Sequence, residues 1–106
     1  MAHTVLICDD AIFMRTMVGD ILQQAGYEVV GETGRGDEAL RLVREMKPDL
    51  AILDIKMPGM DGLEAARHIT KDRICGVLVL TAFSQREVIE EARDAGALAY
   101  LVKPFQ

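Results

Sequence analysis

Apolar and polar positions along this chain form two alternating patterns. Four short runs are almost wholly apolar and a fifth, 27–32, is a weaker run of the same kind; four stretches between them repeat apolar residues every three or four positions. Continuous apolar runs are typical of strands buried on both faces, whereas the wider spacing is typical of amphipathic helices. The predicted strands are 4–8, 27–32, 50–54, 76–80 and 98–102, and the predicted helices are 12–25, 39–46, 63–69 and 88–95.

Turn and cap signals support these boundaries. Gly26 and Gly96 follow the first and fourth helical patterns, where a glycine commonly ends a helix. Lys47-Pro48 follows the second helical pattern, and a helical conformation is disfavoured for the residue before a proline. Asp61-Gly62-Leu63-Glu64 has the spacing of a capping box, which predicts that the third helix begins there.

Strict alternation of strands and helices predicts the fold class. Crossovers between parallel strands are right-handed, so we expect an α/β protein with a doubly wound parallel sheet and helices on both faces. With 106 residues, 50% hydrophobic and 27% charged, the chain has the size and composition of one globular domain. No apolar stretch is long enough to span a membrane and no export signal is visible, so we expect a cytoplasmic protein without membrane contact.

Charge and cysteine content narrow the function. Seventeen acidic residues against twelve Lys and Arg give a net charge of −5. This is unlike the basic surface of nucleic-acid binders, so we expect no direct nucleic-acid binding. Cys8 and Cys75 lie far apart within apolar stretches and lack metal-ligand spacing, so we expect two buried, reduced thiols.

Polar residues that could bind a ligand or take part in a reaction lie where the predicted strands end. Asp9-Asp10 follow the first strand, Asp54 ends the third, Thr81 follows the fourth, and Lys103-Pro104 follow the fifth. Alone, the Asp pair could cap a helix and the Lys could be a solvated end. Because the carboxyl ends of parallel strands meet at one edge, where ligands bind in such folds, their coincidence favours a shared site.

The chemistry of this set points to phosphate and a metal ion. Three neighbouring carboxylates repel one another and need a cation or a raised pKa. Mg²⁺ prefers hard oxygen ligands and binds one or two carboxylates together with phosphate oxygens. A Lys and a Thr hydroxyl can contact phosphoryl oxygens, and a carboxylate such as Asp54 can act as a nucleophile.

These residues resemble the receiver domain of two-component response regulators, of the chemotaxis (CheY-like) type. The resemblance rests on Asp9-Asp10, DIKMPGMDG around Asp54, Thr81-Ala82 and Lys103-Pro104-Phe105, and it covers essentially the whole chain. It implies a flavodoxin-like sheet with strand order 2-1-3-4-5 and one receiver domain over residues 1–106. It also implies a signalling module rather than an enzyme, with only self-catalysed phosphotransfer and autodephosphorylation.

The resemblance assigns a role to each site residue. Asp54 would accept a phosphoryl group from the phosphohistidine of a histidine kinase or phosphotransfer protein. Asp9, Asp10, Asp54 and the backbone carbonyl of Lys56 would bind Mg²⁺ or Mn²⁺. Thr81 and Lys103 would bind phosphoryl oxygens, Thr81 and Tyr100 would form the conformational switch, Lys56, Ala82 and Phe83 would flank the phosphoryl group, and Lys103–Pro104 would be a cis peptide bond. A downstream effector protein or output domain would then read the switch.

The chain departs from the family at its end. Receiver domains have a fifth helix after the KPF turn, whereas this sequence stops at Gln106. We therefore expect a C-terminally truncated domain in which one sheet face carries only the first helix. A homodimer or a domain swap could cover that face. Part of the sequence resembles single-domain chemotaxis regulators, and part resembles receivers that precede an RNA-binding antiterminator domain, so a fragment of a larger regulator remains open.

Other functions fit the residues less well. A flavodoxin-type binder needs a phosphate-cradling loop, but Asp9-Asp10 would repel phosphate there. An Asp-nucleophile phosphatase would need a second acid two residues after Asp54, where Lys56 stands. A structural or dimerising module without signalling would be expected to lack the acceptor, the acid pair or the Lys. A calcium loop at DIKMPGMDG has the wrong ligand spacing.

Overall fold

The computed structural model describes residues 2–82 and 84–103. Within these residues the chain alternates five strands with four helices, as the apolar pattern predicts. The elements are β1 (Thr4–Cys8), α1 (Ile12–Gln24), β2 (Glu28–Thr33), α2 (Gly36–Met46), β3 (Leu50–Asp54), α3 (Gly62–Lys71), β4 (Gly76–Thr81), α4 (Arg86–Asp94) and β5 (Ala99–Val102).

The strands form one parallel sheet in the order β2-β1-β3-β4-β5. This confirms the doubly wound fold and the strand order implied by the resemblance. The central strand is β3, in which Leu53 pairs with Cys8 of β1 and Asp54 pairs with Leu80 of β4. Because β3 has a strand on each side and helices above and below, its apolar run is buried up to Asp54.

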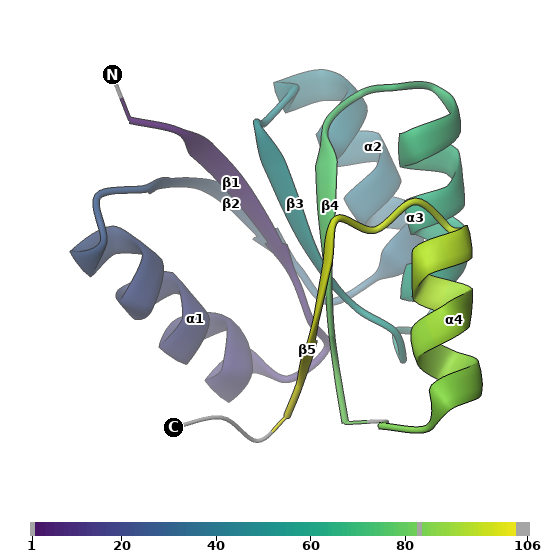
Figure 1. Ribbon diagram of the computed structural model, residues 1–106. Helices are drawn as coiled ribbons and strands as arrows, with labels where there is room; N and C mark the ends of the chain where they lie inside the picture. The colour runs from purple at the N-terminus through teal and green to yellow at the C-terminus, as the bar shows by residue number, and fades with distance from the viewer. Residues whose placement is uncertain (1, 83, 104–106) are drawn as a thin grey trace.

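Two apolar cores lie on opposite faces of the sheet. Val5 and Ile7 of β1 pack with Val18 of α1, whereas Leu6 and Cys8 pack on the side of α2, α3 and α4. Successive residues of a strand point to opposite faces, so one strand supplies both cores. Figure 1 shows the result: among the described residues, α1 is the only helix on one side of the sheet, and α2, α3 and α4 lie on the other.

The face that carries α1 is only partly covered. A groove of about 250 Å³ runs there between α1 and the sheet, with Ile21, Ile52, Leu78 and Leu101 among its lining residues. Ile21, predicted to be part of the buried stripe of α1, is 51% exposed, because α1 is the only helix on this face in the described part of the chain. The expectation that this face carries only the first helix is therefore confirmed for residues 2–82 and 84–103.

Helix ends follow the predicted signals. Gly26 adopts a φ of +92°, a left-handed conformation that glycine tolerates without strain, after α1 has ended at Gln24. Lys47 caps α2 in the left-handed region, so that helix ends before Pro48 as predicted. The Asp61 carboxylate accepts a hydrogen bond from the Glu64 amide at 2.8 Å, which confirms the predicted cap of α3.

The two cysteines are only partly as predicted. Both are free thiols, and Cys8 is fully buried, but Cys75 is half-buried at the start of β4. Burial raises the pKa of both thiols, for Cys75 to about 11, so both stay protonated at neutral pH. Cys75 is less buried than predicted because it precedes β4 at the sheet edge opposite the polar strand ends.

Candidate functional site

The carboxyl edge of the sheet gathers the polar residues predicted to meet there. Asp9 and Asp10 directly follow β1, Asp54 is the last residue of β3, Thr81 is the last of β4, and Lys103 follows β5. Parallel pairing places all of these strand ends at the same edge. The order of the strands puts β1, β3 and β4 side by side, so residues distant in sequence share one small region.

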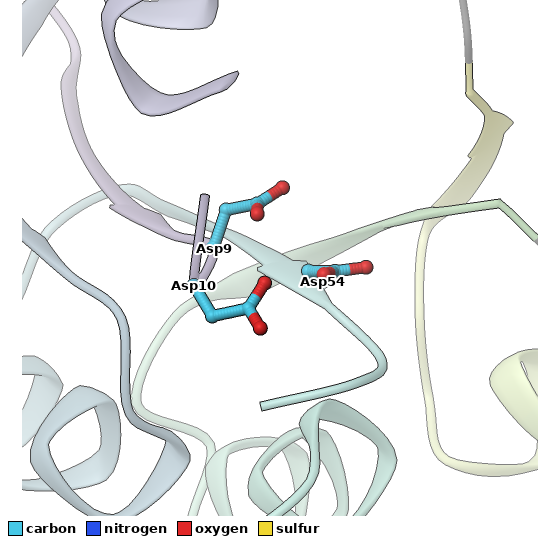
Figure 2. Close-up of side chains that lie close together, drawn as sticks. All are labelled: Asp9, Asp10 and Asp54. Carbon is cyan, nitrogen blue, oxygen red and sulfur yellow. The ribbon is translucent and has the colours of Figure 1, made fainter. Parts of the chain in front are cut away.

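Three carboxylates form the centre of this region. Asp9, Asp10 and Asp54 each offer a carboxylate oxygen, and these atoms all lie within 4.8 Å of one another. Figure 2 shows the three side chains drawn together from the ends of two strands. Asp9 is 1% exposed and Asp54 is 6% exposed, whereas Asp10 is exposed to solvent. The cluster is therefore buried on one side and open to solvent on the other.

Lys103 balances part of this negative charge. Its Nζ lies 2.5 Å from Asp9 Oδ2 and 3.4 Å from Asp54 Oδ2. Its backbone amide donates to the Thr81 carbonyl at 2.6 Å, which holds the residue beside the end of β4. Burial alone would lower the pKa of Lys103, but the hydrogen bond to Asp9 and the charges of both carboxylates raise it overall, so the side chain is a cation at neutral pH.

The environment raises the pKa of Asp54. Burial disfavours its charged form most strongly, and the neighbouring Asp9 charge adds to the effect; Lys103 opposes both. The resulting pKa is about 6, compared with an ordinary value of 3.8. At neutral pH Asp54 is thus mainly ionised, but at a free-energy cost to the folded state.

The donor set suits a small divalent cation. Three carboxylates this close supply hard oxygen ligands, and the open side at Asp10 leaves room for water or phosphate oxygens, as Mg²⁺ requires. Lys56, whose backbone carbonyl was predicted to be a further ligand, lies two residues after Asp54 in the loop before α3, with its side chain exposed. The residues present therefore fit the predicted metal.

The loop that follows Asp54 is folded back tightly on the strand end. The Gly62 amide donates to the Ile55 carbonyl at 2.7 Å, and a Cβ on Gly62 would lie 1.9 Å from the carbonyl oxygen of Asp54. Only glycine allows so close an approach. The start of α3 thereby packs against the main chain at Asp54 and restrains it. The loop between β3 and α3 is also held by the start of α2, where the Gly36 amide donates to the Pro58 carbonyl at 3.2 Å.

The predicted switch residues lie on neighbouring strands. Thr81 is 1% exposed in β4, and Tyr100 of β5 pairs with Val79, two residues before Thr81. Val79 and Tyr100 contribute to the core under α3 and α4, and by alternation Thr81 lies on the same face. Thr81 and Tyr100 are thus placed on one side of adjacent strands.

The remaining predicted residues lie at the margin of the site or beyond it. Ala82 is exposed directly after β4. Phe83 and Pro104 lie outside the described residues. The predicted position of Phe83 beside the phosphoryl group and the predicted cis peptide bond Lys103–Pro104 therefore stay predictions.

Asp9 also has a structural role, although it is not the helix cap considered from the sequence. Its Oδ1 accepts a hydrogen bond from the Ala11 amide at 2.9 Å. The cap position of α1 is occupied by Ala11, which makes no side-chain cap bond. Asp9 therefore closes the turn between β1 and α1 with one carboxylate oxygen, while the other oxygen contacts Lys103.

Sequence reasoning missed Arg15. This side chain reaches back from α1 and donates to the Asp9 carbonyl at 2.5 Å and to Glu32 at 3.3 Å. The one available signal was a basic residue within a run of otherwise apolar and small residues, Ile12 to Gly19, on a helix predicted to face the core.

The structure defines the class of protein as an α/β domain whose doubly wound parallel sheet carries three Asp, a Thr and a Lys at its carboxyl edge. Residues 5–106 match the family described as the response regulator receiver domain. The chain belongs to this family of two-component signalling modules. In the described part of the chain, no helix has the length and apolarity needed to cross a membrane.

Individual relatives support the assignment. The chain is 54% identical over 101 residues to the transcriptional regulatory protein PdtaR of Mycobacterium tuberculosis, covering 95% of this chain but 49% of that protein. It is 47% identical over 107 residues to the chemotaxis protein CheY of Thermotoga maritima, covering 100% of this chain and 89% of that protein. The chain thus spans about half the length of one relative and most of the other.

A solved structure shows the same fold. The crystal structure of the CheX-CheY-BeF3-Mg²⁺ complex from Borrelia burgdorferi aligns with a TM-score of 0.92 at 26% identity. The alignment covers 98% of this chain and 80% of that chain.

The tight contact at Gly62 leads to a prediction about stability. Gly62→Ala should lower the free energy of unfolding by about 1–3 kcal/mol, because the new methyl group would overlap the Asp54 carbonyl and displace the strand end. The matched control is Gly19→Ala within α1, where the nearest atom is 3.7 Å away. That change should raise the free energy of unfolding by about 0.5–1 kcal/mol in a urea titration. Equal effects of the two variants would contradict the packing argument.

The raised pKa of Asp54 predicts a pH-dependent cost. The carboxyl is protonated in both folded and unfolded states well below pH 4 and ionised in both well above pH 6, so its cost to folding is present in full only at the higher pH. Asp54→Asn should therefore raise the free energy of unfolding at pH 8 by about 1–3 kcal/mol, at about 1.4 kcal/mol per pKa unit with partial screening by solvent.

This gain should shrink as the pH approaches 4, measured by urea unfolding at several pH values without divalent cations. Asp20→Asn, an exposed acid on α1, is the control and should show no such trend. A gain from Asp54→Asn that is the same at pH 4 and pH 8 would show that relief of charge burial is not its cause.

Proposed function

We propose that Asp54 is the phosphoacceptor of this receiver domain, and that Asp9, Asp10 and Asp54, with the backbone carbonyl of Lys56, hold Mg²⁺ or Mn²⁺. The observation that carries the proposal is the convergence of three carboxylates and Lys103 at one sheet edge. The Borrelia CheY complex, whose described components include BeF3 and Mg²⁺, supports the same chemistry at this site by its similarity.

The arrangement suits in-line phosphoryl transfer. A carboxylate oxygen of Asp54 forms the new bond to phosphorus while the bond from phosphorus to the donor nitrogen or oxygen breaks, and the electron pair of that bond leaves with the donor. A divalent cation held by Asp9, Asp10 and Asp54 would supply positive charge next to the phosphoryl oxygens. Lys103, 3.4 Å from Asp54, supplies a second positive charge, and Thr81 can donate its hydroxyl to a phosphoryl oxygen.

In this proposal the domain acts as a signalling module rather than an enzyme, with only self-catalysed phosphotransfer and autodephosphorylation. The phosphoryl group moves to a residue of the chain itself, and later hydrolysis returns Asp54 to its starting state. Lys56, Ala82 and Phe83 would flank the phosphoryl group and set the access of water to it.

Switching would pass from Thr81 to Tyr100. A phosphoryl group on Asp54 would draw the Thr81 hydroxyl toward it, and the space vacated behind Thr81 would become available to Tyr100. Placement of both residues on the same face of neighbouring strands supports this coupling. The altered surface at β5 and α4 would then be read by an effector protein or an output domain.

The partners follow from the family. Receiver domains work with histidine kinases and effector domains, and we propose a histidine kinase or phosphotransfer protein as the donor for this one, in the cytoplasm. Since the chain matches about half of the regulator PdtaR, it could equally be the N-terminal receiver of a longer regulator, with a further domain as its output. Residues 1–106 would then belong to the receiver domain of that regulator.

Phosphorylation by a small donor gives the direct test. With Mg²⁺ and acetyl phosphate, the intact mass of the wild type should increase by one phosphoryl group, and Asp54→Asn should show no adduct. Lys103→Ala should slow labelling by about a hundredfold, because it removes a charge that stabilises the transferring group. An adduct that persists in Asp54→Asn would refute the assignment of the acceptor.

A domain that folds but never accepts a phosphoryl group would instead be a structural or dimerising module. Circular dichroism establishes that each variant is folded, and sedimentation of the unphosphorylated protein tests the predicted contact between two copies across the α1 face. A folded wild type without any adduct over a range of Mg²⁺ and donor concentrations would favour that alternative.

Cation binding can be tested without phosphorylation. Mg²⁺ should raise the free energy of unfolding by about 2.7 kcal/mol at a free concentration of 100 times its dissociation constant, since it binds only the folded state. Asp10→Asn should abolish most of this stabilisation, because it removes the charge of one of the three proposed carboxylate ligands, the one on the open side of the cluster. Asp94→Asn, an exposed acid on α4, should leave it unchanged in the same thermal or urea titration.

A further inference from the structure

We propose that Arg15 is a positioning residue for the cation site, which it serves by holding the peptide group that joins Asp9 to Asp10. The inference rests on the proposed function, in which these two carboxylates bind the divalent cation. Arg15 itself touches neither the cation nor the phosphoryl group in this proposal. It acts through the main chain.

Asp9 is held at four of its atoms. Its amide donates to the Thr33 carbonyl at 3.0 Å and its Oδ1 accepts from the Ala11 amide at 2.9 Å. Its Oδ2 accepts from Lys103 at 2.5 Å, and its carbonyl oxygen accepts from Arg15 Nη1 at 2.5 Å. The first bond continues the sheet and the second closes the turn, whereas the Arg15 bond fixes the main chain beyond the last residue of β1.

The position of that carbonyl determines where Asp10 lies. The peptide group is planar, so the Asp9 carbonyl oxygen and the Cα of Asp10 belong to one rigid unit. An Arg15 side chain that holds the oxygen therefore fixes the position of the Asp10 Cα, from which the carboxylate side chain extends. Asp10 is the exposed member of the cluster and accepts no hydrogen bond of its own among those between described residues, so its placement depends on the main chain.

The guanidinium group is anchored on a second side. Arg15 Nε lies 3.3 Å from Glu32 Oε1, and the Arg15 side chain is 17% exposed. Because a guanidinium presents donors in a rigid plane, it can bind a carboxylate of β2 and the Asp9 carbonyl together. Gly34 makes room for this contact: a Cβ there would lie 3.1 Å from Arg15 Nη1 and 3.3 Å from the Asp10 Cα.

Charge and positioning predict opposite effects for this residue. Arg15 is a cation close to a cluster that binds cations, so its charge alone would weaken metal binding, and its removal would strengthen it. If Arg15 instead holds the Asp9–Asp10 peptide in the binding geometry, its removal weakens metal binding. The sign of the change in affinity therefore separates the two roles.

The test measures Mn²⁺ affinity from the electron paramagnetic resonance signal of free Mn²⁺ in titrations of the wild type, Arg15→Gln, Arg15→Lys and Arg41→Gln. Arg15→Gln should weaken binding about tenfold, the loss expected for one hydrogen bond to a charged group. Arg15→Lys keeps a donor for the Asp9 carbonyl and should recover part of the affinity. Arg41→Gln removes an exposed charge on α2 and should bind like the wild type.

A second measurement reports on position without metal. In ¹⁵N-labelled, metal-free protein, Arg15→Gln should shift the amide resonances of Asp10 and Ala11 and speed their hydrogen exchange, while the amides of α3 and α4 stay unchanged. Urea titrations of each variant establish that the loss of affinity is measured on folded protein.

The outcomes separate this inference from the proposed function. If the wild type binds Mn²⁺ and Arg15→Gln binds equally or more tightly, the positioning role is wrong and the cation site stands. If the wild type does not bind Mn²⁺, the cation site and the inference both fall. Weaker Mn²⁺ binding by Arg15→Gln, with unchanged amide resonances and hydrogen exchange at Asp10 and Ala11, would also overturn the inference. The loss of affinity would then not arise from a displaced Asp9–Asp10 peptide.

Discussion

Repulsion among three carboxylates is the constraint on which the rest of the site depends. Parallel pairing brings Asp9, Asp10 and Asp54 to one edge, and two of the three are almost fully buried. Burial and the neighbouring Asp9 charge together outweigh the effect of Lys103, so the pKa of Asp54 remains raised. The folded protein thus carries an electrostatic cost at neutral pH that a divalent cation would relieve, which couples metal binding to stability.

Close main-chain contacts hold this unfavourable cluster in place. Gly62 lets the start of α3 press against the Asp54 carbonyl, and Arg15 holds the carbonyl of Asp9. Each brace acts on the backbone beside an acid and leaves the carboxylate oxygens for Lys103 and for ligands. A site built in this way keeps its like charges together without fully neutralising them, as the proposed nucleophilic attack by Asp54 would require.

The two sheet faces differ in how completely they are covered. Three helices bury one face, and that core includes Tyr100 and lies under the strand that ends in Thr81. On the other face α1 leaves an apolar groove beside Leu78 and Leu101. Apolar surface of this kind is usually covered by further chain or by another protein. Thr81 therefore lies on a buried strand, whereas Tyr100 lies on β5, where the other residues are exposed.

Local sequence determined much of this protein by itself. The spacing of apolar residues was sufficient to predict that each strand and helix exists. The residues at the strand ends predicted which side chains would meet, because parallel strands share one carboxyl edge. Tertiary structure alone decided the rest: the pKa of Asp54 near 6, the two contacts of Lys103, and the hydrogen bond from Arg15 to the Asp9 carbonyl. These depend on burial and on distances between segments far apart in the chain, and a pattern of neighbouring residues carries neither.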